Sequence, residues 1–378
     1  MRSDARRSSR SQNLDDRGPL DTNAKVGGLL RDLATVHTSP HGRWAYARAS
    51  ATILALDEPL EALIQPDGTL RKIAQIGPSS TRIVFEVLRE GRSPTVERAV
   101  AASGKAQEVE RSRSLRQHFL SRARVVAVLS DRDLDGPRVE DYRGDFQVHS
   151  VWSDGAQTLN GLIDAALARG YAYSAVTDHS YGLPVARGMS MSDVARQHIE
   201  IGELNRRYAR RFRLLKGIEA NIGPDGELDL QAGELRRFEL VVAAPHSKLR
   251  VADDQTDRMM ATISTPGVHI LGHPRGRKSG SRAGVIADWD KIFRAAARRR
   301  VAIEIDGDPS RQDIDFALAG RALRAGCLFA LDSDAHAEHE LRYADTAIAH
   351  ARLAGIPASR IVNCWDLDRL LKWTEERK

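Results

Sequence analysis

The sequence predicts an α/β fold: a distorted (β/α)7 TIM-like barrel over residues 144–378, preceded by a small all-α region. Short apolar strand candidates alternate with helical segments, which is typical of a parallel sheet. The strand candidates recur seven times in the last 235 residues, which favours a closed barrel. An open doubly wound sheet is the alternative. The strand candidates are Asp145–His149, Tyr173–Thr177, Arg213–Ile218, Leu240–Ala244, Val268–Leu271, Val301–Ile305 and Cys327–Leu331.

Helical patterns lie between most of these strand candidates, as over Thr158–Arg169, Met191–Arg210 and Trp289–Arg300. The chain before the barrel divides into three segments. Residues 1–18 are rich in Arg and Ser and lack an apolar stretch, so we expect a disordered tail. We expect a small helical domain over residues 19–91 and a helical linker over residues 92–143.

Composition narrows the class of protein. No apolar run approaches the roughly 18 residues of a membrane helix, so no membrane partner is expected. Only Cys327 and Cys364 occur, which excludes a disulfide framework and favours a cytoplasmic location. Residues 1–143 hold 24 Lys and Arg against 19 Asp and Glu, whereas the remainder holds 33 against 32. The basic excess favours a polyanion partner for the N-terminal part, although a soluble surface also explains it.

Metal-ligating residue types stand at or just after six of the seven strand candidates. The carboxyl ends of parallel barrel strands converge on one face, so these side chains should meet in one cavity. A single histidine at such a place is most often a hydrogen-bonded one, and the inference depends on the recurrence. The candidates are His149, Asp154, His179, Glu219, His246, His273, Asp334 and His336.

So many imidazoles and carboxylates in one pocket would be costly without cations to neutralise them. Imidazole and carboxylate together suit Zn, Mn and Fe, and eight candidates allow more than one ion. Clustered metals activate a water and hold the oxygens of a phosphoryl group during in-line displacement. Three basic residues close to these ligands, Lys248, Arg275 and Arg277, are candidates for binding a substrate phosphate. An ordinary surface arginine is the competing interpretation for Arg277.

The motifs around these residues resemble those of the polymerase-and-histidinol-phosphatase (PHP) family over about residues 141–374. The opening family pattern, Asp-Leu-His-x-His-Thr followed by Ser-Asp-Gly, is matched by Asp145-Phe146-Gln147-Val148-His149-Ser150 and Ser153-Asp154-Gly155. The later matches are Thr177-Asp178-His179-Ser180, Gly217-Ile218-Glu219, Pro245-His246, Gly272-His273-Pro274 and Asp334-Ala335-His336.

This resemblance implies the PHP fold, phosphoesterase activity and two or three divalent metal ions, which are Mn or Zn, with Fe or Mg as alternatives. It implies Glu219, Asp334 and His179 as catalytic residues, with Glu219 bridging metals. The likeness is greatest to the C-terminal PHP module of bacterial family X DNA polymerases, which is associated with 3′-5′ exonuclease or 3′-end processing. Gln147 departs from the pattern, because it stands where the family has its first histidine ligand. We expect it to ligate through its amide oxygen, and one metal position to be loose or shifted towards Mn or Mg.

The region 21–91 resembles the lyase-type domain of those polymerases, with a helix-hairpin-helix over Leu70–Leu88 that begins with a short helix over Leu70–Ala74. Such a hairpin would present the backbone amides of Ile76 and Gly77 to a DNA phosphate.

Two observations limit this second resemblance. Gln75 replaces the usual first hairpin glycine, and a hairpin that merely packs is an equal alternative. Residues 92–143 are too few for a nucleotidyltransferase palm, so polymerase activity is not predicted.

Three functions remain open. The favoured function is a metal-dependent phosphoester hydrolase acting on nucleic-acid 3′ ends. A small-molecule phosphomonoesterase of the histidinol-phosphatase type is the alternative within the same class. A catalytically inactive DNA-binding module is the alternative from another class. In that case Gln147, which replaces a histidine ligand, would be the first indication that the catalytic site has been lost.

Overall fold

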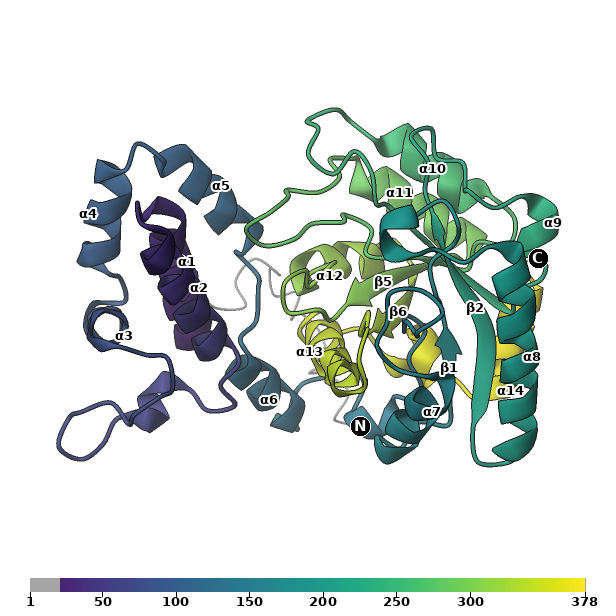
Figure 1. Ribbon diagram of the computed structural model, residues 1–378, viewed down its shortest axis with the longest axis horizontal. Helices are drawn as coiled ribbons and strands as arrows, with labels where there is room; N and C mark the ends of the chain where they lie inside the picture. Colours follow the sequence, from purple (N-terminus) through teal and green to yellow (C-terminus); the bar gives the residue numbers. More distant parts are fainter. Residues whose placement is uncertain (1–20, 378) are drawn as a thin grey trace, which may run out of the picture.

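The computed structural model describes residues 21–377, so the tail expected over residues 1–18 lies outside the described residues. Figure 1 shows two parts side by side: a group of helices formed by the N-terminal residues, and a larger α/β part formed by the rest of the chain. The two parts meet on the side of the α/β part that carries α12 (Phe316–Arg324) and α13 (Ala344–Leu353).

Six parallel strands form one curled sheet, and their spatial order follows the sequence from β1 to β6. The strands are buried along most of their length, which suits this arrangement, because helices cover the outer face and side chains fill the inner one. The α/β class and the parallel sheet are therefore as predicted. The strands are β1 (Tyr173–Val176), β2 (Arg213–Asn221), β3 (Leu240–Ala244), β4 (Ile270–Leu271), β5 (Ala302–Asp306) and β6 (Leu328–Asp332). The further helices of this part are α7 (Leu159–Ala168), α8 (Met191–Arg207), α9 (Ala232–Leu235), α10 (Thr256–Ser264), α11 (Trp289–Arg299) and α14 (Leu367–Glu375).

The expected first strand, Asp145–His149, is not a regular strand. Two of its amides donate to side chains instead of to a neighbouring backbone: Phe146 N to Asp332 Oδ1 at 2.8 Å, and Val148 N to Thr177 Oγ1 at 3.0 Å. Backbone amides that donate to side chains cannot also donate to a neighbouring strand of a β-sheet.

The segment nevertheless lies between the first and last strands of the sheet. On one side, Ala175 N donates to Asp145 O and Thr177 N to Val148 O, each at 2.9 Å. On the other side, His149 N donates to Ala335 O at 2.9 Å, just beyond β6. The segment therefore places His149 beside the ends of both β1 and β6.

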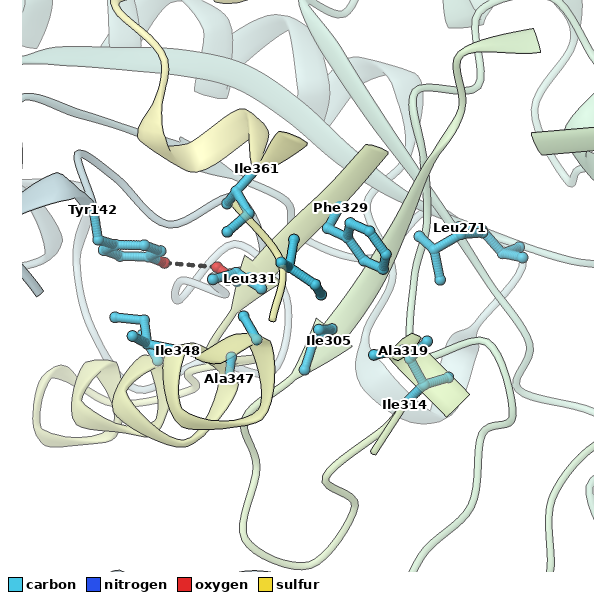
Figure 2. Close-up of a cluster of buried hydrophobic side chains, with 14 of the residues drawn as sticks. Tyr142, Leu271, Ile305, Ile314, Ala319, Phe329, Leu331, Ala347, Ile348 and Ile361 are labelled. Atoms are coloured by element: carbon cyan, nitrogen blue, oxygen red, sulfur yellow. Dashed lines mark hydrogen bonds between the residues drawn. The ribbon is translucent and has the colours of Figure 1, made fainter. Parts of the chain in front are cut away.

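A large apolar core lies between the sheet and its helices, and Figure 2 shows part of it. Ile305 and Phe329 point from β5 and β6 towards this core, and Ala347 and Ile348 come from α13. The Tyr142 hydroxyl donates to the Leu331 carbonyl at 2.8 Å, so the chain entering the α/β part is fixed to β6.

As far as the structure describes it, the N-terminal part contains six α-helices, and four of them begin with a side-chain cap. Asp21, Ser39, Ser93 and Ser121 each accept a hydrogen bond from the first turn of the helix that follows. The helices are α1 (Thr22–Val36), α2 (Pro40–Leu54), α3 (Pro78–Glu90), α4 (Pro94–Ala102), α5 (Ala106–Leu115) and α6 (Arg122–Ser130).

The cores of the two parts do not divide at residue 91. Val96, Val100 and Val109 belong to the same apolar cluster as α1, α2 and α3. Val125 and Val128 of α6 belong instead to the core of the α/β part. The expected division into a domain over 19–91 and a linker over 92–143 stays a prediction, and these packing partners favour a later boundary.

The short helix expected over Leu70–Ala74 is absent, so that prediction was wrong. Leu70 instead forms an antiparallel bridge with Ile64, closed by hydrogen bonds from Gln65 N to Thr69 O at 2.8 Å and from Arg71 N to Leu63 O at 2.9 Å. This tight turn uses the residues that would have started the helix. Of the predicted hairpin, only the second helix, α3, is formed.

Three contacts fix the N-terminal part against the α/β part. The Gln312 amide accepts from Leu120 N at 2.8 Å and donates to Leu120 O at 3.0 Å. Arg122 forms an ion pair with Asp345 at 2.8 Å. Among residues 21–377, none of the helices is both long enough and apolar enough to span a bilayer.

Candidate metal centre

The eight predicted ligand side chains lie together at the carboxyl ends of the strands. His149 and Asp154 come from the segment beside β1, and His179 follows β1 directly. Glu219 lies within β2, which extends three residues further than predicted. The others follow β3, β4 and β6 as His246, His273, Asp334 and His336.

Glu219 is the centre of the cluster. Its Oε1 atom lies 3.2 Å from His246 Nε2 and 3.1 Å from His273 Nε2. Its Oε2 atom lies 3.1 Å from His179 Nδ1 and 3.3 Å from His149 Nε2. One buried carboxylate thus faces four imidazoles, which is the arrangement needed for a ligand shared between cations.

Asp154 organises the outer side of the cluster. Its Oδ1 atom lies 3.6 Å from His179 Nε2, 3.5 Å from His336 Nε2 and 4.0 Å from His149 Nδ1. The side chains of Asp154 and His336 are 31% and 33% exposed, whereas His149 is fully buried. The cluster is therefore open to solvent on the side of Asp154 and His336.

Three overlapping groups of ligand atoms each gather within 4.8 Å: His149, Asp154, His179 and His336; His179, Glu219 and His246; His149, Glu219 and Asp334. His149, His179 and Glu219 each belong to two groups. This sharing suits adjacent cations, because the two oxygens of the Glu219 carboxylate can ligate two ions, whereas each neutral imidazole can ligate one.

Gln147, the substituted ligand position, is also buried at the cluster. Neither atom of its amide has a hydrogen-bond partner among the described residues. Its Oε1 lies 3.3 Å from where a Cβ on Gly272 would be, directly before His273. A fully buried amide without a partner is costly, and a cation would satisfy its oxygen. This residue therefore fits the predicted ligand set.

The protonation states of three ligands fit metal binding, and that of a fourth does not. Burial acts to lower the pKa of His336, but its hydrogen bond with Asp154 raises this pKa to about 9, so its imidazole must lose a proton before it can ligate a metal. Burial lowers the pKa of His179 to about 4, despite the neighbouring Glu219, so its imidazole is neutral. Burial acts to raise the pKa of Glu219, but His179 and His246 hold it well below its usual range. Burial likewise acts to raise the pKa of Asp154, yet its hydrogen bond with His336 holds it at about 2. Neutral imidazoles and ionised carboxylates are the forms that ligate metals.

Asp178 orients the loop that carries two of the ligands, a role that the sequence analysis missed. It accepts hydrogen bonds from Ser150 N at 2.8 Å, Ser153 Oγ at 2.5 Å and Gln197 Nε2 at 2.7 Å. These bonds fix the backbone between His149 and Asp154. Its place beside His179 in the motif was the available signal.

Arg311 is the second residue that the sequence analysis missed. It follows β5 and is not part of any quoted motif. Its Nη1 atom lies 2.8 Å from Asp334 Oδ2 and 3.7 Å from Asp306 Oδ2. Arg311 thus supplies a fixed positive charge inside the centre.

The three predicted phosphate-binding residues differ in their positions. Lys248 is exposed, and its ammonium approaches Pro224 O at 3.5 Å, so it is available to a ligand. Arg275 is partly exposed and lies 3.3 Å from Asp315 Oδ2.

Arg277 does not fit that prediction. It is 2% exposed, lies 3.0 Å from Asp315 Oδ2 and donates to the backbone carbonyls of Arg311 and Gln312. Its guanidinium also lies over the ring of Phe119, 4.8 Å from the centroid. These contacts occupy the guanidinium of Arg277 within the fold, so the assignment of Arg277 to a substrate phosphate was wrong.

The predicted DNA contacts Ile76 and Gly77 directly precede α3, the second helix of the predicted hairpin, whereas the first helix of that hairpin is not formed. Gly77 is exposed at the N-cap of α3, and Gln75 adopts a φ of 66°, the left-handed conformation that glycine favours. Their contact with DNA stays a prediction.

The chain is similar to three kinds of curated relatives or solved structures, and no family model matches it. It is 33% identical over 226 residues to the DNA polymerase/3′-5′ exonuclease PolX of Bacillus subtilis, covering 60% of this chain but only 40% of that protein. It is 31% identical to a probable phosphatase of Enterobacter sp. (strain 638), covering 90% of it, and 30% identical to the probable phosphatase YcdX of Escherichia coli O139:H28, covering 95% of it. The structure of a histidinol phosphate phosphatase from Lactococcus lactis, complexed with zinc, L-histidinol and phosphate, matches with 15% identity and a TM-score of 0.41, over 56% of this chain and 94% of that one.

Parallel strands that gather histidines and carboxylates at their carboxyl ends, in a chain related to phosphatases over nearly their whole length, define a metal-dependent phosphoesterase. Divalent cations held in such a centre polarise a phosphoester and activate water. The chain belongs to the polymerase-and-histidinol-phosphatase family, as its motifs predicted.

Proposed function

We propose that this protein hydrolyses phosphoesters at the 3′ ends of nucleic acid, as a 3′-5′ exonuclease or a 3′-end processing enzyme. The observation that carries the proposal is the pairing of a helical part, in the basic third of the chain, with a metal centre whose Asp154 and His336 face solvent. A polyanion needs such an open site together with nearby positive charge. The relative that is named a polymerase and exonuclease supports the same assignment.

In this proposal, each side chain has a role that its position allows. Glu219, Asp334 and His179 would hold the reacting centre, together with the remaining ligands Gln147, His149, Asp154, His246, His273 and His336. Lys248 and Arg275 would orient the scissile phosphate through their charges. The ions would be two or three of Mn or Zn, with Fe or Mg as alternatives.

The helical part would contact the nucleic-acid backbone, with Ile76 and Gly77 at the start of α3 as the proposed DNA contacts. Backbone amides at a helix start bind phosphate without reading sequence. We therefore expect the affinity for nucleic acid to fall strongly with rising salt and to depend little on sequence.

The test is hydrolysis of labelled DNA. Purified protein with Mn is incubated with 5′-labelled single strands and duplexes, and the products are resolved by length. A ladder that shortens from the 3′ end supports the proposal, and Asp334→Ala is the negative control. Products that instead arise by internal cleavage, or no products at all, contradict it.

A small-molecule phosphomonoesterase is the second candidate, and a specific observation favours it. The chain covers 90% and 95% of two probable phosphatases, whereas it covers 40% of the polymerase relative. Parallel assays with histidinol phosphate and p-nitrophenyl phosphate distinguish the two. Turnover of the small esters without DNA cleavage would assign this function. Salt-dependent DNA binding with no turnover of any ester would favour the inactive DNA-binding module instead.

A further inference from the structure

We infer that the cleft between the N-terminal helices and the α/β part is a second ligand site, which binds a phosphorylated organic molecule of nucleotide size. The cleft has a volume of about 540 Å³ and lies between α1, α2 and the loops after β4 and β5. Its size is that of a small-molecule site, and such sites are common where two parts of a protein meet. None of the predicted metal ligands lines it.

The charge of the cleft wall indicates an anionic ligand. Seven basic but only two acidic side chains line it. The two acids are already used: Asp32 pairs with Arg113 at 2.7 Å and Arg116 at 2.6 Å, and Glu97 pairs with Arg113 at 2.7 Å.

Arg31 is the residue that an anion would satisfy. Among residues 21–377, its guanidinium forms no ion pair with an acidic side chain and donates no hydrogen bond. The side chain is partly buried, and burial and the charge of Arg116 lower its pKa. A half-buried cation beside another cation is unfavourable until a negative group binds between or beside them.

Two adjacent glycines in α1 indicate where the body of the ligand would lie. A Cβ on Gly27 would lie 2.6 Å from the Leu54 side chain, so close packing of α1 on α2 explains this glycine. A Cβ on Gly28 would meet only Arg116, at 3.6 Å, so packing does not explain the second glycine. Glycine inside a helix is destabilising relative to alanine, and a close approach of ligand to backbone is one reason to retain it.

The opposite wall offers groups for the polar parts of the ligand. Ser279 and Ser310 line the cleft and are joined by a hydrogen bond from Ser279 N to Ser310 O at 2.8 Å. Ser310 and Gln312 flank Arg311, which extends to Asp334 in the metal centre. A ligand in the cleft would therefore contact the loop that positions Arg311.

The test is calorimetric titration of the full chain with the phosphonate analogue of AMP, in which carbon replaces the ester oxygen so that the metal centre cannot cleave it. Adenosine and inorganic phosphate are titrated separately as the two halves of the ligand. We expect the analogue to bind at least tenfold more tightly than either half. Equal binding of inorganic phosphate alone would overturn the proposed organic ligand.

Four variants locate the site. Arg31→Gln should weaken binding at least tenfold, and Gly28→Leu, which fills the cleft without a close contact at its Cβ, should do the same. Arg43→Gln, at an exposed arginine of α2 outside the cleft, is the matched control and should leave binding unchanged. Asp334→Ala should also retain binding. Loss of binding in Asp334→Ala but not in the two cleft variants would place the analogue at the metal centre and overturn the inference, as would absence of binding at millimolar analogue.

Discussion

Arg311 Nη1 lies 2.8 Å from Asp334 Oδ2, while the other oxygen of Asp334 lies 3.1 Å from His149 Nε2. Asp334 has a φ of 52°, an unusual value for a residue with a side chain, so its position depends on its neighbours. Burial acts to raise the pKa of Asp334, but Arg311 holds this pKa far below its usual range. The arginine thus keeps the carboxylate ionised and aimed at the centre.

The first prediction concerns this pair. Arg311→Lys keeps a positive charge but removes the planar guanidinium that contacts Asp334. We therefore expect kcat/KM to fall by about 10- to 100-fold, which is the usual effect of losing a residue that orients a metal ligand. Steady-state kinetics at saturating Mn measures the change. Arg321→Lys, at a partly exposed arginine on α12, is the control. Full activity of Arg311→Lys would show that the pair is not needed to hold Asp334.

The second prediction concerns the shared ligand Glu219. Glu219→Gln preserves shape but replaces the charge that faces four imidazoles, so turnover should be lost and the amount of bound metal should be reduced. His149→Ala and Asp334→Ala should behave in the same way with the fold intact by circular dichroism. His339→Ala, at an exposed histidine three residues from His336, should be active. Retained activity and normal metal content in all three ligand variants would refute the assignment of the centre.

The third prediction concerns Gln147. An imidazole is a better ligand for Zn than an amide, and the buried amide has no hydrogen bond to lose. Gln147→His should therefore raise the amount of Zn that remains after dialysis against a chelator. Metal content by mass spectrometry measures it. Less retained metal in the variant would mean that position 147 does not face the ions.

The fourth prediction is a pH dependence of stability that comes from His350. Its Nδ1 accepts from Phe316 N at 3.1 Å and its Nε2 lies 2.8 Å from Gln312 Oε1, which fixes a neutral ring. Burial lowers its pKa to about 3, below the usual value of about 6.5 in an unfolded chain. The folded protein therefore binds fewer protons, and this stabilisation is complete above about pH 6.5 and lost as the pH falls towards 3.

Urea unfolding at several pH values tests this. Between pH 6 and 4, the free energy of unfolding of the wild type should fall by about 1.4 kcal/mol more per pH unit than that of His350→Gln. Only the wild type has an imidazole at this position, which takes up a proton when the chain unfolds. Parallel curves for the two proteins would show that His350 titrates normally.

The fifth prediction separates structure from substrate binding at Arg277. Removing one partner of a buried ion pair costs about 3–5 kcal/mol, so Arg277→Met should lower the free energy of unfolding by that order. KM for a phosphoester should stay close to the wild-type value. Arg294→Met, on the exposed side of α11, is the control. A large rise in KM at unchanged stability would restore the phosphate-binding role.

The sequence was sufficient for the parts of the fold that repeat. Five of the six strands begin within one residue of the expected position, because buried parallel strands are continuous apolar runs with clear ends. The segment Asp145–His149 is different, since its amides donate to the side chains of Asp332 and Thr177, which are distant in sequence. No local pattern reveals such partners.

The ligand cluster was predictable because most of the ligands lie at or just after the carboxyl end of a predicted strand, so the fold class alone gathers them. Arg311 and Arg277 were not, for opposite reasons. Arg311 is brought to Asp334 by the loop after β5, and sequence distance hides that contact. Arg277 follows a ligand closely in sequence, yet its side chain turns away to Asp315. Proximity in sequence does not fix the direction of a side chain.

The most direct test of the central claim, that these side chains share cations, is the metal content of the purified protein after equilibration with Mn or Zn and removal of free ions. The structure predicts at least two ions per chain, reduced in Glu219→Gln and unchanged in His339→Ala. A wild-type protein that retains no divalent metal under these conditions would contradict the account.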